Sequence, residues 1–425
     1  MLNMLETLAP VHGVATQHSV IRPREPHQPL WTVAVELAGQ SPAGGVSNDE
    51  YPLHLVGACG THLSDTMARA AGEAVERHAL IPQTEAKPHT VHTMQGQLPQ
   101  DAVRFHEHGL GDSEAWGREL DWYKGIDLVA HTSVAIPAPL IDYWPEGASD
   151  PAFDPSPSGA ASGPNLWEAT RAALLEIIER DAVLTAWAEQ RALDAACPTD
   201  VFERADPWQR VQLLRLYTAS QRQGLTPTIA HIVHPTTGVH TAVCLLHDPQ
   251  PPGDWRGGAA GLVGCGSKAA PDLVTGAIGA LREALQIRGV LLGVAQHYRN
   301  IHHAATRPIV SDLDRAKHFA TESGAETLLS WARSFHSPTH RHPYPTENVA
   351  CDVDALVRGI SADGGTPLLV DLTSRLPHSL QHMGWNAVKV VVVGYQPLRI
   401  NERMSFTWCG SRVPAARTNA PHPLV

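Results

Sequence analysis

The amino-acid sequence predicts an α+β fold that forms a single large domain. Candidate strands and candidate helices occur in separate clusters without regular alternation, which is typical of mixed α+β proteins. No long linker divides the 425 residues, although this length also permits several smaller domains. Related acidic motifs are spread over more than half of the chain, and they can form one site only if the chain folds as one unit.

The strands are predicted from short segments that are rich in β-branched or aromatic residues, several of which alternate apolar and polar positions. These segments are residues 28–38, 51–56, 120–129, 132–140, 228–233, 240–246, 367–372 and 387–393. Two segments rich in Gly, Pro, Ser and Ala, residues 144–164 and 253–266, are predicted as loops.

Three long helices are predicted from their apolar periodicity and their start signals. The first runs to about Leu80, with Ser64 or Asp65 as its N-cap. The second covers about residues 166–191, after a capping box of the form Asn-x-x-Glu that begins at Asn165. The third begins at Pro271-Asp272 and runs to about residue 295.

Each of these helices carries a version of one acidic motif. Glu-x-x-Glu-Arg occurs twice, as Glu73, Glu76 and Arg77 and as Glu176, Glu179 and Arg180. The third version has Gln for the second Glu and places its Arg one position later, as Glu283, Gln286 and Arg288. Positions three and four apart lie on one face of a helix. Apolar residues fill most other positions, so the carboxylates are expected to be buried, which is costly unless they are paired or bind metal. The pattern therefore predicts a magnesium site that holds phosphate.

A single copy of this motif has a simpler explanation, because Glu and Arg at these spacings commonly form ion pairs on a solvated helix face. Three related copies, each within an apolar helix and each after a loop that contains Gly or Ser, favour a shared site instead.

The composition excludes several classes of protein. Hydrophobic residues make up 43% of the chain and charged residues 18%, as in ordinary globular proteins. A formal net charge of -11 argues against a general surface for nucleic acid or anionic membranes. The first residues do not resemble a signal peptide, no apolar stretch is long enough to span a bilayer, and the six cysteines lack Cys-x-x-Cys spacing. We therefore expect a cytoplasmic protein with reduced thiols.

The three motifs together resemble those of the YcaO superfamily. The family's first motif, Ser-Ala-x-Gly-Glu-Ala-x-Glu-Arg, is similar to residues 70–77, with Ala70 in place of the Ser. Its second motif is a Ser-Asn-Gly-x-Ala-x-Gly loop followed by Leu-Glu-x-x-Glu-Arg-Asp, and it is similar to residues 157–163 and 175–181, with Ser158 in place of the loop Asn. Its third motif, Glu-Ala-x-Gln-x-Arg, is similar to residues 283–288. The family's Gly-Lys-Gly before the first helix is replaced by residues 60–62, which read Gly-Thr-His.

The resemblance continues to the end of the chain. Residues 371–373 and 393–398 look like the family's Asp-Leu-Thr and Pro-Gly-x-Gln-Pro-Leu segments. Residues 421–425, Pro-His-Pro-Leu-Val, are similar to the Pro-His-Pro-Phe-Pro tail of azoline-forming members. We therefore predict a YcaO-like catalytic domain over residues 57–425, with residues 1–56 as N-terminal strands and loops of the same domain.

The resemblance implies an enzyme that uses ATP and Mg²⁺ to phosphorylate a peptide backbone amide. The residues that it assigns to Mg²⁺ are Glu73, Glu76, Glu176, Glu179 and Glu283. Those that it assigns to the nucleotide are Arg77, Arg180, Gln286, Arg288 and Ser158. It places the tail residues His422 and Pro423 at the catalytic site, with His422 as a proton-transfer group.

Several alternatives remain open at the level of sequence. The favoured product is an azoline in a ribosomally made peptide, but the same activation step gives a macrocyclic amidine in bottromycin-type pathways, or a thioamide. A different class of function is a non-catalytic YcaO-like scaffold for a partner enzyme. The expected partners are a precursor peptide and, because no appended leader-recognition domain is evident, a separate leader-binding protein or a second copy of the chain.

Overall fold

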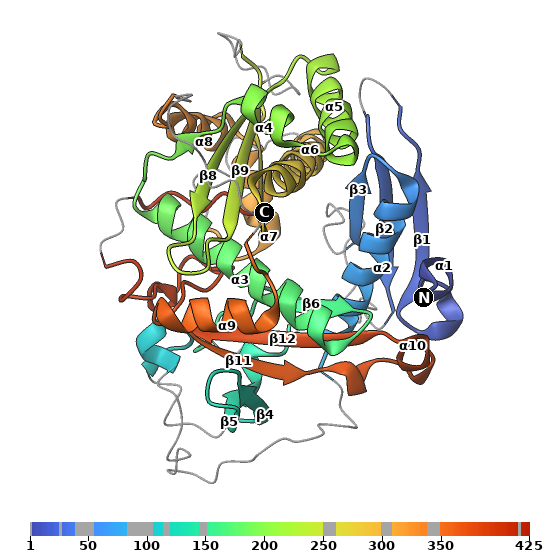
Figure 1. The fold of residues 1–425 in the computed structure, drawn as a ribbon, viewed down its shortest axis with the longest axis vertical. Coiled ribbons are helices and arrows are strands. Elements are labelled where there is room, and N and C mark those ends of the chain that lie inside the picture. Colours follow the sequence, from blue (N-terminus) through green and yellow to red (C-terminus); the bar gives the residue numbers. More distant parts are fainter. Residues whose placement is uncertain are drawn as a thin grey trace.

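The structure is a computed structural model, and it describes residues 2–24, 28–38, 55–82, 105–113, 120–143, 151–249, 261–298, 308–337, 349–414 and 418–425. Within these ranges the strands form three antiparallel sheets, and helices lie between and around them (Figure 1). The mixed α+β fold class that the sequence predicts is therefore confirmed.

The first sheet has three strands in the order β1 (Ala15–Ile21), β2 (Trp31–Leu37) and β3 (Val56–Gly60). Helix α2 (Leu63–Leu80) follows β3 directly and packs against β2 and β3. Residue Val56, at the proposed domain boundary, therefore begins a strand of this sheet, and the division of the chain at residue 57 stays a prediction.

The second sheet has four strands in the order β10 (Gly264–Ala270), β9 (His240–His247), β8 (Thr226–Val233) and β7 (Asp194–Ala195). Helix α6 (Leu273–His297) lies against β10 and β9. The helix comes so close to β10 that a Cβ atom at Gly264 would lie 2.2 Å from the carbonyl oxygen of Ala284. Glycine is required at this contact because any larger residue would push the helix away from the sheet.

The third sheet has five strands in the order β5 (Thr132–Pro137), β4 (Trp122–Asp127), β11 (Thr366–Asp371), β12 (Asn386–Val393) and β6 (Ala160–Gly163). β12 is almost entirely buried, which explains why its sequence is a run of valines rather than an alternating pattern. Helix α3 (Leu166–Ala188) covers β12 and β6 on one face of this sheet.

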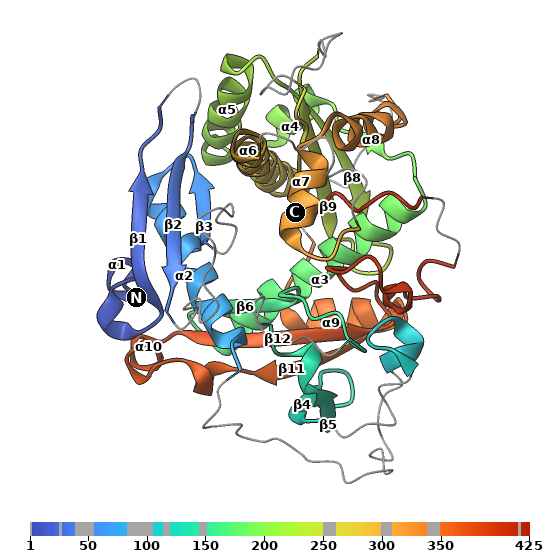
Figure 2. The same cartoon turned by 180° about the vertical axis from the view of Figure 1, so that it is seen from behind.

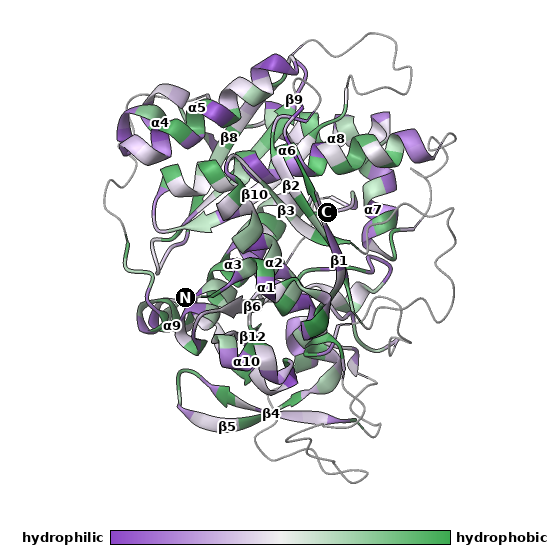
Figure 3. Ribbon diagram, turned by 90° about the vertical axis from the view of Figure 1, so that its right-hand side faces the viewer, coloured by the Kyte–Doolittle hydropathy of each residue, from purple (hydrophilic) through white to green (hydrophobic). Residues whose placement is uncertain are grey.

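The remaining α-helices of the described ranges are shorter and lie mostly on the outside. They are α1 (Met4–Thr7), α4 (Pro198–Arg204), α5 (Pro207–Arg222), α7 (Asp312–Phe319), α8 (Glu322–Arg333), α9 (Val353–Ala362) and α10 (His378–Met383). Short 3₁₀ turns occur at Pro10–His12, Phe105–His108, Ala138–Leu140, Thr373–Arg375 and Ser405–Thr407. Figure 3 shows hydrophilic and hydrophobic residues side by side along outer helices such as α5, as expected for helices with one buried face.

Helix α3 lies at the centre of the molecule. Figures 1 and 2 show it between the four-stranded and the five-stranded sheets, and it contacts β9 and β10 on one side and β6 and β12 on the other. Its start is the predicted one, because the Asn165 side chain accepts a hydrogen bond of 2.8 Å from the Glu168 backbone N–H. The C-terminus of the chain also lies near this centre (Figure 1).

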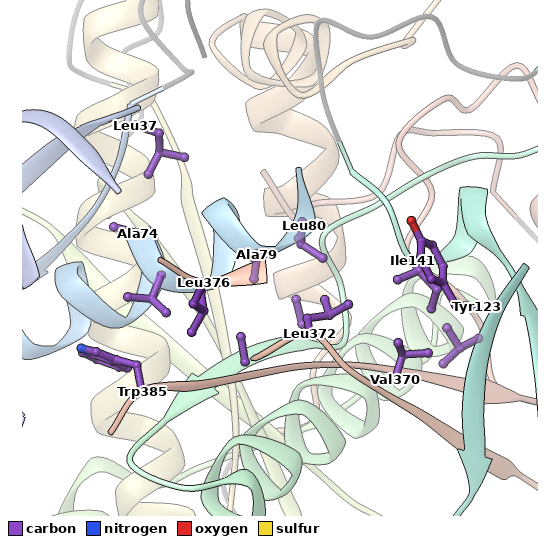
Figure 4. Close-up of a cluster of buried hydrophobic side chains, with 14 of the residues drawn as sticks. Leu37, Ala74, Ala79, Leu80, Tyr123, Ile141, Val370, Leu372, Leu376 and Trp385 are labelled. Carbon is purple, nitrogen blue, oxygen red and sulfur yellow. The ribbon is translucent and has the colours of Figure 1, made fainter. Parts of the chain in front are cut away.

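A continuous hydrophobic core joins the first and third sheets through α2. Figure 4 shows Leu37 of β2, Ala74 and Leu80 of α2, Val370 of β11 and Trp385 before β12 converging in this cluster. Burial of large side chains of this kind is the main source of stability in folded proteins. The core therefore fixes α2, with its acidic motif, against the sheet that also carries α3.

Three details of the sequence prediction are wrong. The predicted loop 144–164 contains strand β6 (Ala160–Gly163), whose small residues read as a loop but pair with the edge of β12. The predicted loop 253–266 ends earlier in the described part, since Gly264 begins strand β10; glycine is depleted in strands, but here the close helix contact requires it. The N-cap of α2 is His62, not Ser64 or Asp65. Asp65 lies in the first turn, where its carboxylate instead accepts a hydrogen bond of 3.0 Å from Arg69 Nη2.

No helix among the residues that the structure describes is both long and apolar enough to span a bilayer.

Candidate functional site

The first two acidic motifs are brought together by a contact between α2 and β6. The Ser162 hydroxyl of β6 donates a hydrogen bond of 2.8 Å to the carbonyl oxygen of Gly72, which directly precedes Glu73 on α2. Since β6 leads into α3, this contact sets the start of one motif helix against the middle of the other. The two motifs are more than a hundred positions apart in the sequence and meet only through this packing.

On α2, Arg77 pairs with both motif carboxylates. Its Nε atom lies 2.8 Å from Glu73 Oε1 and 3.8 Å from Glu76 Oε1. Burial raises the pKa of Glu76 well above its usual value, the negative charges of Glu73 and Glu176 raise it further, and Arg77 opposes the shift. Glu76 is therefore a carboxylate with an excess of negative charge around it, which a bound cation would relieve.

On α3, Arg180 holds the same position relative to its own motif. Its Nε atom lies 3.5 Å from Glu176 Oε1, and its Nη1 atom lies 3.8 Å from Glu179 Oε1. Burial would lower the pKa of Arg180, but the charges of Glu179, Glu176 and Glu283 raise it above its ordinary value. Arg180 thus interacts electrostatically with carboxylates of both the α3 motif and the α6 motif.

Glu179 is the most buried of the motif carboxylates, with a side chain that is 3% exposed. It accepts hydrogen bonds from Ser267 Oγ at 2.7 Å and from the Ala269 backbone N–H at 3.0 Å, and Lys268 Nζ lies 3.6 Å away. Burial acts to raise the pKa of Glu179, but Lys268, Arg180 and the two hydrogen bonds together hold it below the usual value. Glu179 is therefore held in its ionised form, and each of its two oxygens accepts one hydrogen bond.

Glu283 on α6 lies beside this group. It accepts a hydrogen bond of 2.6 Å from the Ser267 backbone N–H. Burial raises the pKa of Glu283, and the neighbouring charge of Glu179 raises it further. Gln286 is half-buried one turn later on the same helix.

Arg288 is buried and its described contacts point to the other side of α6. Its Nη1 atom donates to Gln223 Oε1 at 3.3 Å, at the end of α5. Burial lowers its pKa, and the charge of Asp248 opposes this shift. The structure thus brings Arg77 and Arg180 to the carboxylates more directly than Arg288, whose predicted contact with the nucleotide stays a prediction.

Ser158 lies beneath the α3 motif and is 7% exposed. Its hydroxyl is buried and has no hydrogen-bond partner among the residues that the structure describes. Since buried hydroxyl groups are nearly always hydrogen-bonded, this orphaned group suits a ligand that completes the site. The next residue, Gly159, donates its backbone N–H to Glu176 Oε2 at 3.3 Å.

The C-terminal tail is ordered and packed against α3. His422 is 2% exposed, and its Nε2 atom lies 2.6 Å from the Arg399 carbonyl oxygen, so Nε2 is the donor. Burial lowers the pKa of His422 far below its usual value, and the charge of Arg315 adds to this effect. Pro423 and Leu424 are also buried, and Leu424 packs in a cluster with Trp187 of α3. His422 is thus a neutral, enclosed imidazole, and its role as a proton-transfer group stays a prediction.

Three residues that the sequence reasoning missed contribute to these groups. Ser267 and Lys268 on β10 contact Glu179, and Lys389 on β12 lies near Glu176. A single lysine inside a run of valines was the available signal for Lys389, because a buried lysine needs a specific partner. No comparable pattern marked Ser267 or Lys268, whose role depends on the packing of α3 against β10.

These residues fit a magnesium–nucleotide complex, judged by their chemistry. Among the described residues, no three His, Cys, Asp or Glu side chains are grouped closely enough to hold a metal ion by themselves. The carboxylates instead stand in two groups, Glu73, Glu76 and Glu176 between α2 and α3, and Glu179 and Glu283 between α3 and α6. Mg²⁺ is usually held by one or two carboxylates together with substrate phosphates, which matches such incomplete groups.

Residues 57–396 match the family of YcaO cyclodehydratases, which is described as binding ATP and Mg²⁺. The chain belongs to the YcaO family. The matched segment includes all three acidic motifs and ends before the C-terminal tail. YcaO membership therefore accounts for the three motif helices, and the family's cofactors are ATP and Mg²⁺.

Solved structures of YcaO proteins and heterocyclases share this fold. A heterocyclase in complex with substrate and cofactor has a TM-score of 0.70 and 18% identity to this chain. The match covers 99% of this chain and 56% of the heterocyclase chain. YcaO from Methanopyrus kandleri bound with AMPPCP and Mg²⁺ has a TM-score of 0.56 and 17% identity, over 92% of this chain and 89% of that one. The E. coli microcin synthetase McbBCD complex with pro-MccB17 bound has a TM-score of 0.59 and 14% identity, over 89% and 88% of the two chains. At these identities the likeness shows the fold.

A curated relative is similar over a shorter segment. It is an uncharacterized protein in the tfuA 3′ region of Rhizobium leguminosarum bv. trifolii, 32% identical over 117 residues. The match covers 27% of this chain and 28% of that relative, so it adds no information about the activity of the whole YcaO protein.

Proposed function

We propose that this protein is an ATP-dependent enzyme that phosphorylates a peptide backbone amide and forms azoline heterocycles in a ribosomally made peptide. The observation that carries the proposal is the position of Arg180. Its Nε atom lies 3.5 Å from Glu176 Oε1 and its Nη1 atom lies 3.8 Å from Glu179 Oε1, and the charge of Glu283 on α6 also raises its pKa. A guanidinium surrounded by buried carboxylates is suited to hold both the carboxylates and a phosphate in place.

The two carboxylate groups have distinct proposed roles. Glu73, Glu76 and Glu176 form the more negative group and would hold Mg²⁺, and Glu179 and Glu283 would hold a second ion or orient Arg180. When bound, Mg²⁺ neutralises the charge that develops on transferring phosphates. Arg77 and the Ser158 hydroxyl would contact phosphate oxygens beside the first group.

The proposed reaction overcomes the poor leaving ability of an amide oxygen. A side-chain thiol or hydroxyl of the peptide attacks the preceding carbonyl carbon, and the resulting oxyanion takes the terminal phosphoryl group of ATP. Loss of phosphate then leaves the ring double bond, so that one water is removed from the peptide in total. The contribution of this chain is to fix the phosphates through Arg77 and Arg180 and to exclude water from a buried site.

Two other products use the same activation step. An internal amine as nucleophile gives a macrocyclic amidine, and a sulfur donor gives a thioamide. A non-catalytic scaffold is the alternative of another class, and the retention of all five motif glutamates argues against it. The proposed partners are a precursor peptide and a separate leader-binding protein or a second copy of the chain, and the proposed location is the cytoplasm. The similarity to a chain of the McbBCD complex with pro-MccB17 bound supports a peptide substrate and a partner protein.

The proposal is tested with purified protein, Mg²⁺-ATP and candidate precursor peptides encoded by neighbouring genes. The expected result is peptide-dependent ATP turnover together with a peptide that has lost water, and fragmentation then places the ring and separates an azoline from an amidine. A gain of sulfur for oxygen would assign thioamide formation instead. Failure of the protein to bind or hydrolyse ATP in the presence of Mg²⁺ would contradict the proposed enzyme function and favour the non-catalytic scaffold.

A further inference from the structure

Lys389 is a buried lysine in the middle of β12, between Val388 and Val390. It is 2% exposed, and its Nζ atom donates hydrogen bonds to two backbone carbonyl oxygens, that of Ser156 at 2.7 Å and that of Ser158 at 2.6 Å. An ammonium group is costly to bury and is tolerated only where such partners are present. The segment 156–158 is therefore tied to β12 by a side chain at the base of the candidate site.

The same segment is tied to the site on its other side. The Gly159 carbonyl oxygen accepts a hydrogen bond of 2.7 Å from the Val390 backbone N–H, and the Gly159 N–H donates to Glu176. Gly159 has a φ of +80°, and a Cβ atom there would lie 2.2 Å from the Val390 carbonyl oxygen. Only glycine fits this position, so the backbone of residues 156–159 lies directly between β12 and the carboxylate of Glu176.

Lys389 also places a positive charge beside the first carboxylate group. Burial lowers its pKa to about 8, while the charges of Glu176 and then Glu76 act in the opposite direction. The two carboxylates come from different helices, α3 and α2, and the lysine comes from the sheet beneath them.

Packing alone does not require a lysine at this position. Residues on both faces of β12 are buried, and the neighbouring positions are filled by apolar side chains. Removing the ammonium group alone would leave the carbonyl oxygens of Ser156 and Ser158 without their donor, which is a local cost at this segment. A methionine would fill the same space among the valines. The lysine is therefore best explained by what its ammonium group holds.

We propose that Lys389 is a positioning residue for nucleotide binding: it fixes the backbone of residues 156–159, and through that backbone it sets Glu176 and the Ser158 hydroxyl for Mg²⁺ and phosphate. The inference rests on the proposed function, because the ligand that these groups receive is the nucleotide. In this proposal Lys389 acts through the backbone that it holds.

The test compares three variants for binding of Mg²⁺-AMPPCP by calorimetry, and for thermal unfolding without nucleotide. Lys389→Met removes both the charge and the donors, and binding is expected to weaken at least tenfold at a temperature well below the unfolding midpoint of the variant, where it is fully folded. Lys389→Gln keeps a donor for one of the two carbonyls, and at least threefold weaker binding is expected. Lys124→Met, at an exposed position of β4, is the matched control and should bind as the wild type does.

A second readout does not depend on nucleotide at all. Amide hydrogen exchange of residues 156–160 in the nucleotide-free protein should be faster in Lys389→Met than in Lys124→Met, because the segment loses its two carbonyl contacts.

The outcomes separate this inference from the function on which it rests. Wild-type affinity and wild-type exchange in Lys389→Met, or in Lys389→Gln if the methionine variant does not fold, would overturn the inference alone. If the wild-type protein itself does not bind Mg²⁺-AMPPCP, the proposed function fails and the inference fails with it.

Discussion

Glu179 on α3 and Glu283 on α6 are bound by one and the same residue, Ser267 of β10. The Ser267 hydroxyl lies 2.7 Å from Glu179 Oε1, and its backbone N–H lies 2.6 Å from Glu283 Oε2. The two carboxylates accept hydrogen bonds from different groups of this one residue, and their charge environments differ, since the pKa of Glu179 is lowered and that of Glu283 is raised. One strand residue thus connects the motif carboxylates of two helices.

Glu176→Gln should keep the fold and remove most ATP turnover. The amide is nearly isosteric with the carboxylate, but it is a much weaker ligand for Mg²⁺. Turnover is measured with saturating peptide and Mg²⁺-ATP after circular dichroism confirms folding. Glu168→Gln, at an exposed position on the same helix, is the control and should keep wild-type turnover. Wild-type turnover in Glu176→Gln would remove Glu176 from the metal site.

Arg180→Lys should lower kcat/KM for ATP at least about tenfold, which corresponds to roughly 1.4 kcal/mol of transition-state stabilisation. The guanidinium reaches Glu176 and Glu179 with different nitrogen atoms, and a lysine is a point charge that cannot repeat this geometry. Arg171→Lys, at a half-buried position in the first turns of α3, is the matched control. Unchanged steady-state kinetics in Arg180→Lys would show that the planar group has no role in catalysis.

Deletion of residues 421–425 should impair peptide modification much more than nucleotide binding. Within the tail, His422 is hydrogen-bonded to the Arg399 carbonyl oxygen, and Leu424 packs in a cluster with Trp187 of α3. Because the deletion also exposes core surface, thermal unfolding is measured first, and the assay is run well below the midpoint. His422→Gln keeps the tail in place and reports on the imidazole alone. A truncated protein that modifies its peptide at the normal rate would exclude the tail from catalysis.

Stability should fall as the pH is lowered from 8 to 5.5. Burial lowers the pKa of six described histidines below the ordinary value of 6.5, namely His78, His231, His234, His240, His318 and His422. Below pH 6.5 the unfolded chain therefore binds protons at these histidines that the folded protein does not, which lowers the free energy of unfolding. Each such group contributes up to about 1.4 kcal/mol per pH unit in that window. The carboxyls of Glu76, Glu283 and Asp154, whose pKa values burial raises, act in the opposite direction, but they are fewer than the histidines.

Urea unfolding at several pH values checks this expectation. His240 is fully buried, and neither ring nitrogen has a hydrogen-bond partner among the described residues, so His240→Leu should reduce the slope by up to one proton. His382→Gln, at an exposed position, should leave the slope unchanged. A stability that is independent of pH between 8 and 5.5 would contradict the prediction.

The helices that carry the motifs could be predicted from the sequence because their signals are local. The cap at Asn165, the aspartate before α6 and the apolar periodicity are all properties of neighbouring residues, and they place α3 and α6 within a few positions of their observed bounds. The start of α2 was placed less well, since no side chain caps it and His62 fills the position. Strand β10 was missed because its glycines are explained only by the approach of α6.

The sequence by itself determined the residue types of the site: five glutamates, their arginines and the three apolar helices that carry them. Only the tertiary structure decided how they are grouped. Long-range packing sets Glu76 beside Glu176, joins Glu179 to Glu283 through Ser267, and turns Arg288 toward Gln223. The physical reason is that motif spacing fixes neighbours on one helix, whereas contacts between helices depend on sheet register and close approach, which no local pattern records.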